Sequence, residues 1–151
     1  MKTLNKKKKP YKGEFVFEQE LATVASVMKC KYVKVPDAIK TKDSLIKKRG
    51  GGYTMAEDTR PCDGILVTPS GNYLIECKYN YGQLKPHQKR MSDDINRVNG
   101  SYYILRKKIK ITKTPYKIKI TYTIEKREKK VRNVIMKTNN ITEIFKYFKE
   151  L

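Results

Sequence analysis

The chain has 151 residues, 38% of them hydrophobic and 33% charged, which is enough for one domain with a core and too few for two ordinary domains. Its formal net charge of +20, from 35 Lys and Arg against 15 Asp and Glu, exceeds what solubility needs. That charge predicts attraction to a polyanion, with nucleic acid ahead of an anionic membrane surface. No run of about eighteen apolar residues occurs, so no membrane-spanning helix is expected.

The compartment is predicted from the cysteines and the N-terminus. Cys30, Cys62 and Cys77 are odd in number and form no CxxC pair, which is typical of free, buried thiols in a reducing compartment. Their spacing from His87, the only histidine, resembles no zinc site. The N-terminus is basic but lacks the apolar core of a secretion signal. We therefore expect a cytoplasmic protein, bacterial or from a cell infected by a virus or phage, that is not secreted.

The first third of the chain predicts a basic tail, a helix and a strand. Residues 1–12 form the tail, which serves either solubility or phosphate binding; its lysine run is Lys6, Lys7, Lys8 and Lys9. Residues 14–29 predict a helix, because apolar residues recur at spacings of three and four; these are Phe17, Leu21, Val24 and Met28. Residues 31–36 predict a short strand. Residues 37–60 show no period and contain three consecutive glycines, so we expect a lid, a DNA-contacting loop or a disordered segment.

The middle of the chain predicts a hairpin, a helix and a strand. The stretch CDGILVTPSGNYLIECK gives two apolar runs around a turn. Residues 80–100 predict a loop and then a helix that starts at Pro86 and stops at Gly100. Residues 101–107 predict the next strand. The order helix, strand, strand, strand, helix, strand indicates a mixed α/β fold.

The C-terminal residues 107–151 predict a basic hairpin and a closing helix. Lys or Thr alternates with Ile or Tyr on both sides of Thr114-Pro115, a pattern typical of strands with one polar face. Residues 131–137 predict a further strand and residues 141–151 a helix. Residues 106–132 hold twelve Lys or Arg against two Glu, with Tyr116 and Tyr122 among them and Tyr103 shortly before. This composition favours a phosphate-binding surface over its alternative, a solvated sheet face with tyrosines in the core.

The hairpin carries charges where a buried strand should have none. A two-residue Ser70-Gly71 loop would place Asp63 opposite Lys78 and keep Glu76 on the same face of the sheet. Any loop of even length preserves that clustering, whereas a shift of one residue scatters it. The alternative is a charge-balanced hairpin end with an Asp63–Lys78 ion pair and a solvated Glu76. Glu76, however, lies in the apolar run YLIECK, where a lone carboxylate is costly without a metal or a partner.

Two carboxylates and a lysine at one end of a hairpin suit Mg²⁺ or Mn²⁺ chemistry, since these cations take hard oxygen ligands. The stretch PCDGILVTPSGNYLIECK resembles the metal-site motif of the PD-(D/E)xK nuclease superfamily: an Asp, a hairpin, then Glu-x-Lys. The following residues resemble Holliday-junction resolvases and virus-type replication-repair nucleases, with a loop, a helix carrying a Gln, a glycine and a strand. Here Cys62 separates Pro61 from the Asp, a small departure from the family pattern. The resemblance covers residues 14–106.

The resemblance implies a restriction-endonuclease-like αβββαβ core in residues 13–106, with residues 107–151 as an extension packed on it. It implies that Asp63, Glu76 and the Cys77 backbone carbonyl are metal ligands. Lys78 would position or activate the attacking water, and Gln88 would orient the phosphate or the lysine.

The same resemblance requires an acid from the first helix. Glu18 matches the family pattern best, Glu20 is the second choice and Glu14 the third. Their alternative is a set of surface acids favoured by the helix dipole.

The expected function is a metal-dependent DNA endonuclease that acts on branched DNA as a homodimer in recombination, repair or replication, with no membrane partner. The alternatives are a restriction-type or nicking endonuclease on the same fold, a nucleic-acid-binding protein without catalysis, and a basic ribosome-associated or membrane-surface protein. The expected DNA contacts are Lys6, Lys7, Lys8, Lys9, Lys85, Lys89, Arg90, Lys107, Lys108, Lys117 and Lys119.

Overall fold

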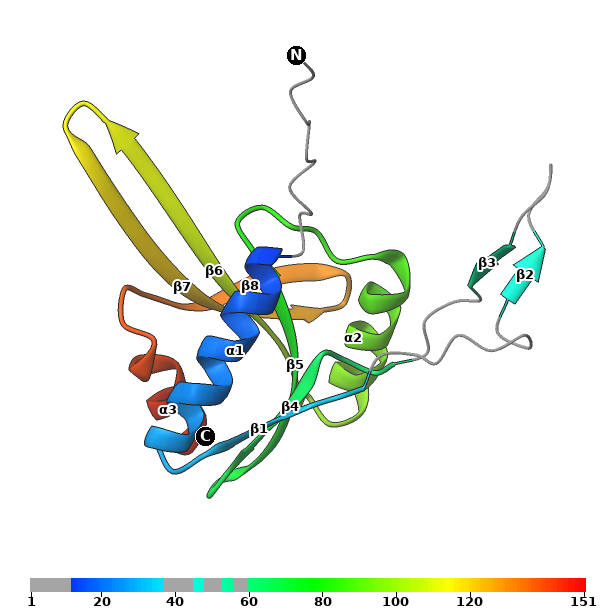
Figure 1. The fold of residues 1–151 in the computed structure, drawn as a ribbon. Coiled ribbons are helices and arrows are strands. Elements are labelled where there is room, and N and C mark those ends of the chain that lie inside the picture. Colours follow the sequence, from blue (N-terminus) through cyan, green and yellow to red (C-terminus); the bar gives the residue numbers. More distant parts are fainter. Residues whose placement is uncertain (1–11, 37–44, 48–52, 56–59) are drawn as a thin grey trace, which may run out of the picture.

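A computed structural model describes residues 12–36, 45–47, 53–55 and 60–151. This part of the chain is a mixed α/β fold with a six-stranded mixed sheet, a separate two-stranded sheet and three helices (Figure 1). The elements in chain order are α1 (Lys12–Val27), β1 (Lys31–Lys34), β2 (Leu45–Lys47), β3 (Tyr53–Met55), β4 (Gly64–Thr68), β5 (Gly71–Tyr79), α2 (Pro86–Val98), β6 (Tyr102–Lys113), β7 (Tyr116–Glu128), β8 (Val131–Thr138) and α3 (Thr142–Lys149).

The large sheet has the strand order β1-β4-β5-β6-β7-β8. Strands β5 and β6 are parallel and are joined through α2, whereas the other neighbouring pairs are antiparallel. A parallel pair needs a long crossover connection, and the segment containing α2 supplies it. The predicted helix stop is confirmed: Gly100 adopts φ +69° and its N–H donates to the Ile95 carbonyl.

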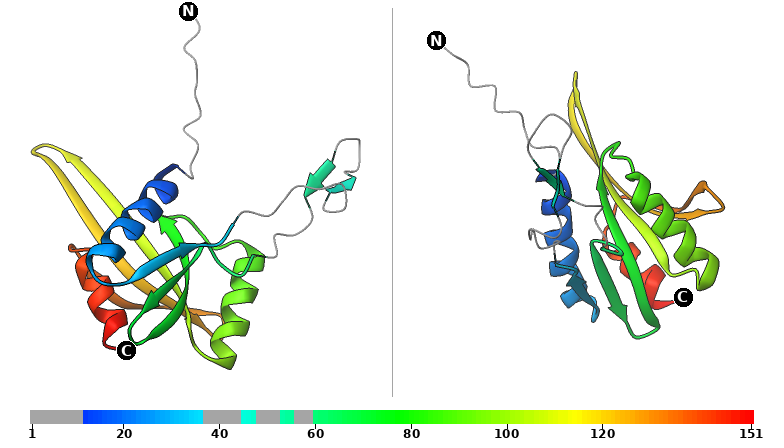
Figure 2. Two further views of the ribbon diagram at one scale, coloured as in Figure 1. Left: turned by 60° about the horizontal axis from the view of Figure 1, so that its bottom comes forward. Right: turned by 90° about the vertical axis from the view of Figure 1, so that its right-hand side faces the viewer.

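Helices cover both faces of the sheet, α1 on one side and α2 on the other (Figure 2). The main core lies on the α1 side, where Phe17 and Leu21 of α1 are buried and Val24 and Met28 pack at its border, as the spacing predicts. Helix α3 closes the same core through Ile144, Phe145 and Phe148, all fully buried. The three cysteines are buried free thiols, also as predicted.

The predicted element order is confirmed, with two differences. Residues 37–60 were expected to lack regular structure, but within them β2 and β3 pair antiparallel, Leu45 opposite Met55. Strands of three residues are too short to show a period in the sequence. The strand predicted at 101–107 also continues to Lys113 as one strand, β6, so the boundary expected between core and extension at 106/107 falls inside it. Of the predicted tail at residues 1–12, only Lys12 is described, and it begins α1 and does not belong to a tail. Residues 1–11, 37–44, 48–52 and 56–59 lie outside the described residues.

The distal part of the β6–β7 hairpin, residues 108–121, projects from the body of the protein, and we call it the arm (Figure 1). Its two faces differ, because alternate residues of a strand point to opposite sides. One face carries Lys108, Lys110, Thr112, Lys117, Lys119 and Thr121. The other carries Ile109, Ile111, Lys113, Tyr116, Ile118 and Ile120.

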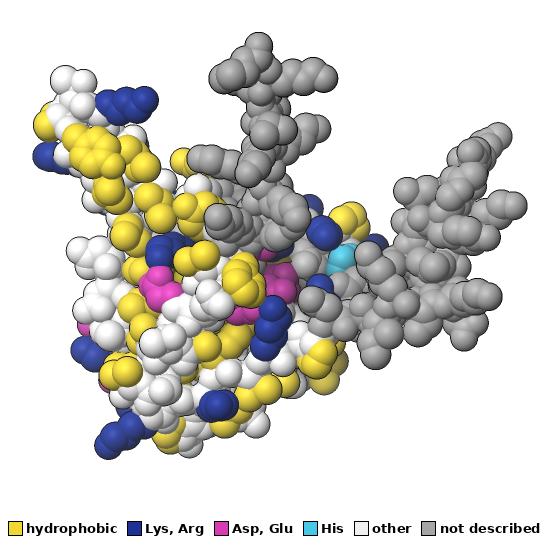
Figure 3. All heavy atoms as spheres, in the orientation of Figure 1, with side chains coloured by type: hydrophobic (Ala, Val, Ile, Leu, Met, Phe, Trp, Pro, Cys, Tyr) yellow, Lys and Arg dark blue, Asp and Glu magenta, His cyan; other side chains and the backbone are white. Residues whose placement is uncertain are grey.

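The apolar face of the arm is not covered by the core. Ile111 and Ile118, which pair across the strands, are 55% and 54% exposed. Figure 3, drawn from the α1 side, shows this face as a run of hydrophobic side chains along the arm. The alternation therefore predicts the two faces correctly, but half of the hairpin extends beyond the elements that would bury it.

Candidate active site

The β4–β5 hairpin brings Asp63 and Glu76 together, in a register that differs from the predicted one. Thr68 pairs with Gly71, so the loop is Pro69-Ser70 and not Ser70-Gly71. The Thr68 hydroxyl accepts hydrogen bonds from the N–H groups of Ser70 and Gly71, which holds the turn at this position. Pairing is thereby displaced by two residues. Asp63, one step beyond the last pair of Gly64 with Ile75, lies opposite Glu76 and not opposite Lys78. An even displacement leaves the three charged residues on one face.

Strand β4 starts at Gly64, opposite Ile75, so the backbone groups of β5 beyond Ile75 have no partner residue in β4. The Cys77 N–H donates to Asp63 Oδ2 at 2.8 Å in place of a β4 carbonyl. Because the N–H and C=O of one strand residue point toward the same neighbour, the Cys77 carbonyl points to the same edge. Two carboxylates and one carbonyl oxygen therefore converge at the point where β4 leaves the sheet.

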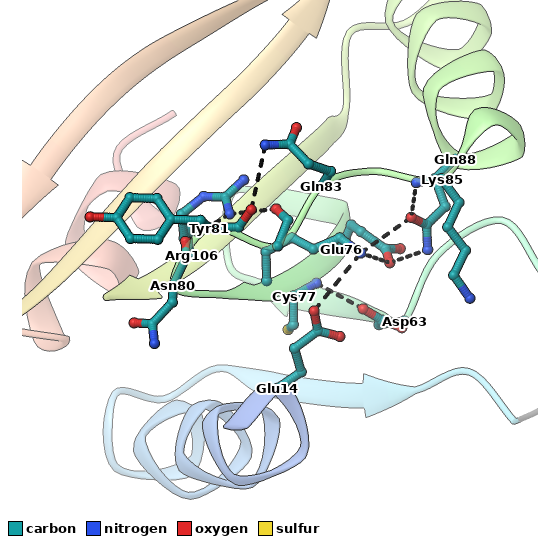
Figure 4. A network of polar contacts seen from close by, with 12 residues as sticks. Glu14, Asp63, Glu76, Cys77, Asn80, Tyr81, Gln83, Lys85, Gln88 and Arg106 are labelled. Atoms are coloured by element: carbon teal, nitrogen blue, oxygen red, sulfur yellow. Dashed lines mark hydrogen bonds and ion pairs between the residues drawn. The ribbon is translucent and has the colours of Figure 1, made fainter. Parts of the chain in front are cut away.

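Gln88 in the first turn of α2 lies beside Glu76 (Figure 4) and connects this acid with Lys78 of the same strand, β5. Its Nε2 donates to Glu76 Oε1 at 2.7 Å, while its Oε1 accepts from Lys78 Nζ at 3.2 Å and from the Lys85 N–H at 2.8 Å. Glu76 and Lys78 are only 2% and 4% exposed. Gln88 therefore occupies a half-buried bridging position and does not lie on an exposed helix face.

The three candidate acids of α1 occupy different surroundings. Glu14, the third choice from the sequence, lies 3.9 Å from Lys78 Nζ, as close to this ammonium as Glu76 is. The remaining two acids have other partners: Glu18 accepts from the Tyr32 hydroxyl at 2.7 Å and pairs with Lys34, and Glu20 binds Lys107 and Tyr122.

Helical spacing explains this division. Residues four apart share a helix face, so Glu14 and Glu18 both face the hairpin end. Glu18 also lies near the site, because its carboxylate, that of Asp63 and the Cys77 thiol come within 4.8 Å of one another. Glu20 lies on a different face and contacts β6 and β7 instead. The structure thus brings Glu14 and Glu18 to the site and leaves Glu20 away from it.

The site is electrostatically unbalanced toward the acids. Burial, together with the charge and hydrogen bonding of Asp63, raises the pKa of Glu76 to about 8, despite the opposing charge of Lys78. Burial also raises the pKa of Glu14 above its ordinary value, and Lys78 only partly offsets it. A divalent cation would favour the ionised form of each acid.

The donor set fits a hard cation better than a soft one. Asp63, Glu76 and the Cys77 carbonyl offer oxygen atoms, the ligands that Mg²⁺ and Mn²⁺ prefer. The Cys77 thiol is a poor ligand, because complete burial and the charge of Asp63 raise its pKa well above the ordinary value and keep it protonated.

Buried polar contacts hold the loop between β5 and α2. Arg106 of β6, 3% exposed, donates to the carbonyls of Asn80 and Gly82 and binds Glu125 of β7 at 2.8 Å. Burial tends to raise the pKa of Glu125, but its bonds with Arg106 and Thr123 outweigh burial and hold it below the ordinary range. Tyr102 also donates to Glu76, at 3.3 Å. Neither Tyr102 nor Arg106 was identified from the sequence. Tyr102 is one of several aromatic or apolar residues of its strand, and Arg106 is one of many basic residues, so no local pattern marks either of them.

The expected DNA-contacting residues fall into four groups. Lys85, Lys89 and Arg90 lie on the α2 side, near the site. Lys108, Lys117 and Lys119 lie on the basic face of the arm. Lys107 lies on the opposite face, where it pairs with Glu20 and covers the Tyr122 ring. The lysines of residues 6–9 lie outside the described part of the chain. Lys110 was missed, although the two-residue alternation places it on the same face as Lys108.

Comparisons with known proteins place the chain in no group: no family model, no curated protein and no solved structure matches it. Among the described residues, no helix combines the length and apolar character needed to cross a membrane.

Proposed function

We propose that this protein is a metal-dependent DNA endonuclease that hydrolyses phosphodiester bonds with an activated water. One observation carries the proposal: a single hairpin end gathers Asp63, Glu76 and Lys78, and Gln88 bridges the last two. A structural ion pair needs one acid and one base. This site has a surplus of buried acid beside an ordered ammonium, on the surface of a chain with a net charge of +20.

The side chains divide the work as follows. Asp63, Glu76 and the Cys77 carbonyl would hold Mg²⁺ or Mn²⁺, which supplies charge neutralisation at the phosphate and a more acidic bound water. Lys78 donates to the attacking water or to a phosphate oxygen. Gln88 fixes the Lys78 ammonium and the Glu76 carboxylate relative to each other, and Glu14 adds a second acid beside Lys78. The restriction-endonuclease-like core, branched DNA as substrate and a homodimer with paired sites belong to the same proposal.

The test is a cleavage assay on a labelled four-way junction beside a linear duplex of the same sequence, with Mg²⁺, with Mn²⁺ and with EDTA. Asp63→Asn and Glu76→Gln should each lower cutting by about 10³-fold, because each removes a charged ligand worth several kcal/mol. Glu150→Gln, at an exposed position after α3, serves as a matched control with the same change in charge.

Three outcomes separate the possibilities. Metal-dependent cutting of the junction alone, lost in both site variants, supports the proposal in full. Equal cutting of both DNAs keeps the nuclease and removes the preference for branches. Salt-sensitive binding without cutting in any metal overturns the nuclease in favour of a binding protein.

A further inference from the structure

The basic face of the arm concentrates like charges without acidic partners in its own sequence. Lys110 and Lys119 lie directly opposite each other across the strands, with Lys108 and Lys117 one rung away on either side. The sequence contains no Asp or Glu between Arg106 and Glu125. Like charges in directly opposed positions destabilise a sheet. An anion placed over these rungs would relieve that repulsion.

This basic face continues from the face of the sheet that carries the candidate site. In the parallel β5–β6 pair, Glu76 lies beside Ile104 and Lys78 beside Arg106. Lys108 and Lys110 follow Arg106 at two-residue steps, so they point to the same side as Lys78. A ligand lying along the arm therefore reaches the site without passing around an edge of the sheet.

The chemistry of the face selects duplex nucleic acid among polyanions. Lysines act as point charges and read phosphates without sequence preference. Single-stranded nucleic acid is normally held by successive aromatic rings. On the arm, Tyr116 lies on the opposite, apolar face, and the one ring that the described residues place beside the basic face, that of the exposed Tyr81, lies 5.2 Å from the Lys108 ammonium. An anionic membrane would take up the apolar face while the lysines lie among its headgroups. The lysine face, and not the apolar face, continues from the candidate site, which favours nucleic acid.

We propose that the basic face of the arm binds the phosphate backbone of a DNA duplex that extends outward from the candidate site. That this duplex is cleaved at the candidate site rests on the proposed nuclease function, whereas binding of the duplex by the arm does not. From Arg106 to Lys113, seven residue steps along β6, an extended strand covers about 24 Å. At 3.4 Å per base pair, the arm follows about seven base pairs.

The test compares two variants with the same loss of charge. In the arm variant, Lys110, Lys117 and Lys119, all exposed, are changed to Gln. In the control variant, Lys29, Lys146 and Lys149 are changed to Gln. Lys29 follows the C-terminal end of α1, and the other two lie in the last turn of α3, away from the arm. Binding to a duplex of about two helical turns is measured by fluorescence anisotropy in EDTA, between about 50 and 200 mM salt. A single strand and anionic vesicles are tested in parallel.

The arm variant should bind the duplex about 10²-fold more weakly than wild type, with a salt slope smaller by about 3, while the control variant stays close to wild type. Equal losses in both variants would mean that only net charge matters and would overturn the proposal. An equal loss on single strands would overturn the duplex assignment, and loss of vesicle binding alone would assign the arm to membranes. Because no metal is present, these results stand whether or not the protein cuts DNA.

Discussion

At the scale of single residues, the most informative side chain is Lys78. Its ammonium lies 3.2 Å from Gln88 Oε1 and 3.9 Å from both Glu14 and Glu76. A buried lysine with acids on two sides is held in one orientation, which is what positioning a water molecule requires.

The first prediction concerns the acid supplied by α1. Glu14→Gln should reduce metal-dependent cleavage more strongly than Glu18→Gln, because Glu14 contacts Lys78 while Glu18 is engaged by Tyr32 and Lys34. Single-turnover rates for both variants provide the measurement. A larger loss in Glu18→Gln would return the helix acid to the residue favoured by the sequence pattern.

The second prediction concerns pH and the metal-free protein. Burial and Asp63 raise the pKa of folded Glu76 to about 8, above its value in the unfolded chain. Between these two values the unfolded chain binds fewer protons, so the stability of the folded state falls as pH rises. Glu76→Gln cannot ionise, and in EDTA it should be more stable than wild type by about 4 kcal/mol at about pH 9, with a much smaller difference at about pH 5. Urea unfolding at both pH values measures this. A difference in free energy of unfolding between the variant and wild type that is the same at both pH values would contradict the prediction.

At the scale of elements, the site depends on the loop that carries the chain from β5 into α2. Arg106 holds this loop through two backbone carbonyls and is itself held by Glu125. The third prediction is that Arg106→Met destabilises the fold by about 3–5 kcal/mol, because it removes the main charged partner of the buried Glu125 carboxylate.

Replacing both partners, with Arg106→Met and Glu125→Leu, should recover part of that loss, because no unpaired charge then remains between the strands. Chemical denaturation measures both free energies of unfolding. A loss below about 1 kcal/mol in the single variant would show that Arg132, which also pairs with Glu125, is sufficient by itself.

Local patterns in the sequence predict most of these elements. Apolar spacing locates α1, Pro86 and Gly100 bound the segment of α2, and two-residue alternation marks both strands of the arm. The register of the β4–β5 hairpin was wrong by two residues, because the side chain of Thr68, and not the loop residues alone, sets the turn. The choice among Glu14, Glu18 and Glu20 depends on how α1 packs across β5, which no local pattern contains.

At the scale of the whole molecule, the arm stands outside the packing that stabilises the fold. Residues 110–119 are exposed on both faces, and the core is closed without them by α1, α3 and the inner halves of β6 and β7. The fourth prediction is that replacing residues 110–119 by Asn-Gly, which suits a two-residue hairpin turn, leaves the protein folded. Its Tm should change by less than about 5 °C, since few buried contacts are lost. Scanning calorimetry tests this, and loss of the cooperative transition would make the arm a structural element.

The continuity of β6 gives the molecule a fixed scale of length. One strand runs from the Arg106 position beside Lys78 to the tip at Lys113, so no break in the strand separates the candidate site from the far end of the arm. The length of the arm is therefore set by the number of residue pairs in the hairpin. Adding two residues to each strand would extend it by about 7 Å with its faces unchanged, whereas adding one would turn the lysines to the wrong side. The number of residues in the hairpin therefore sets the distance between the candidate site and a ligand bound at the tip.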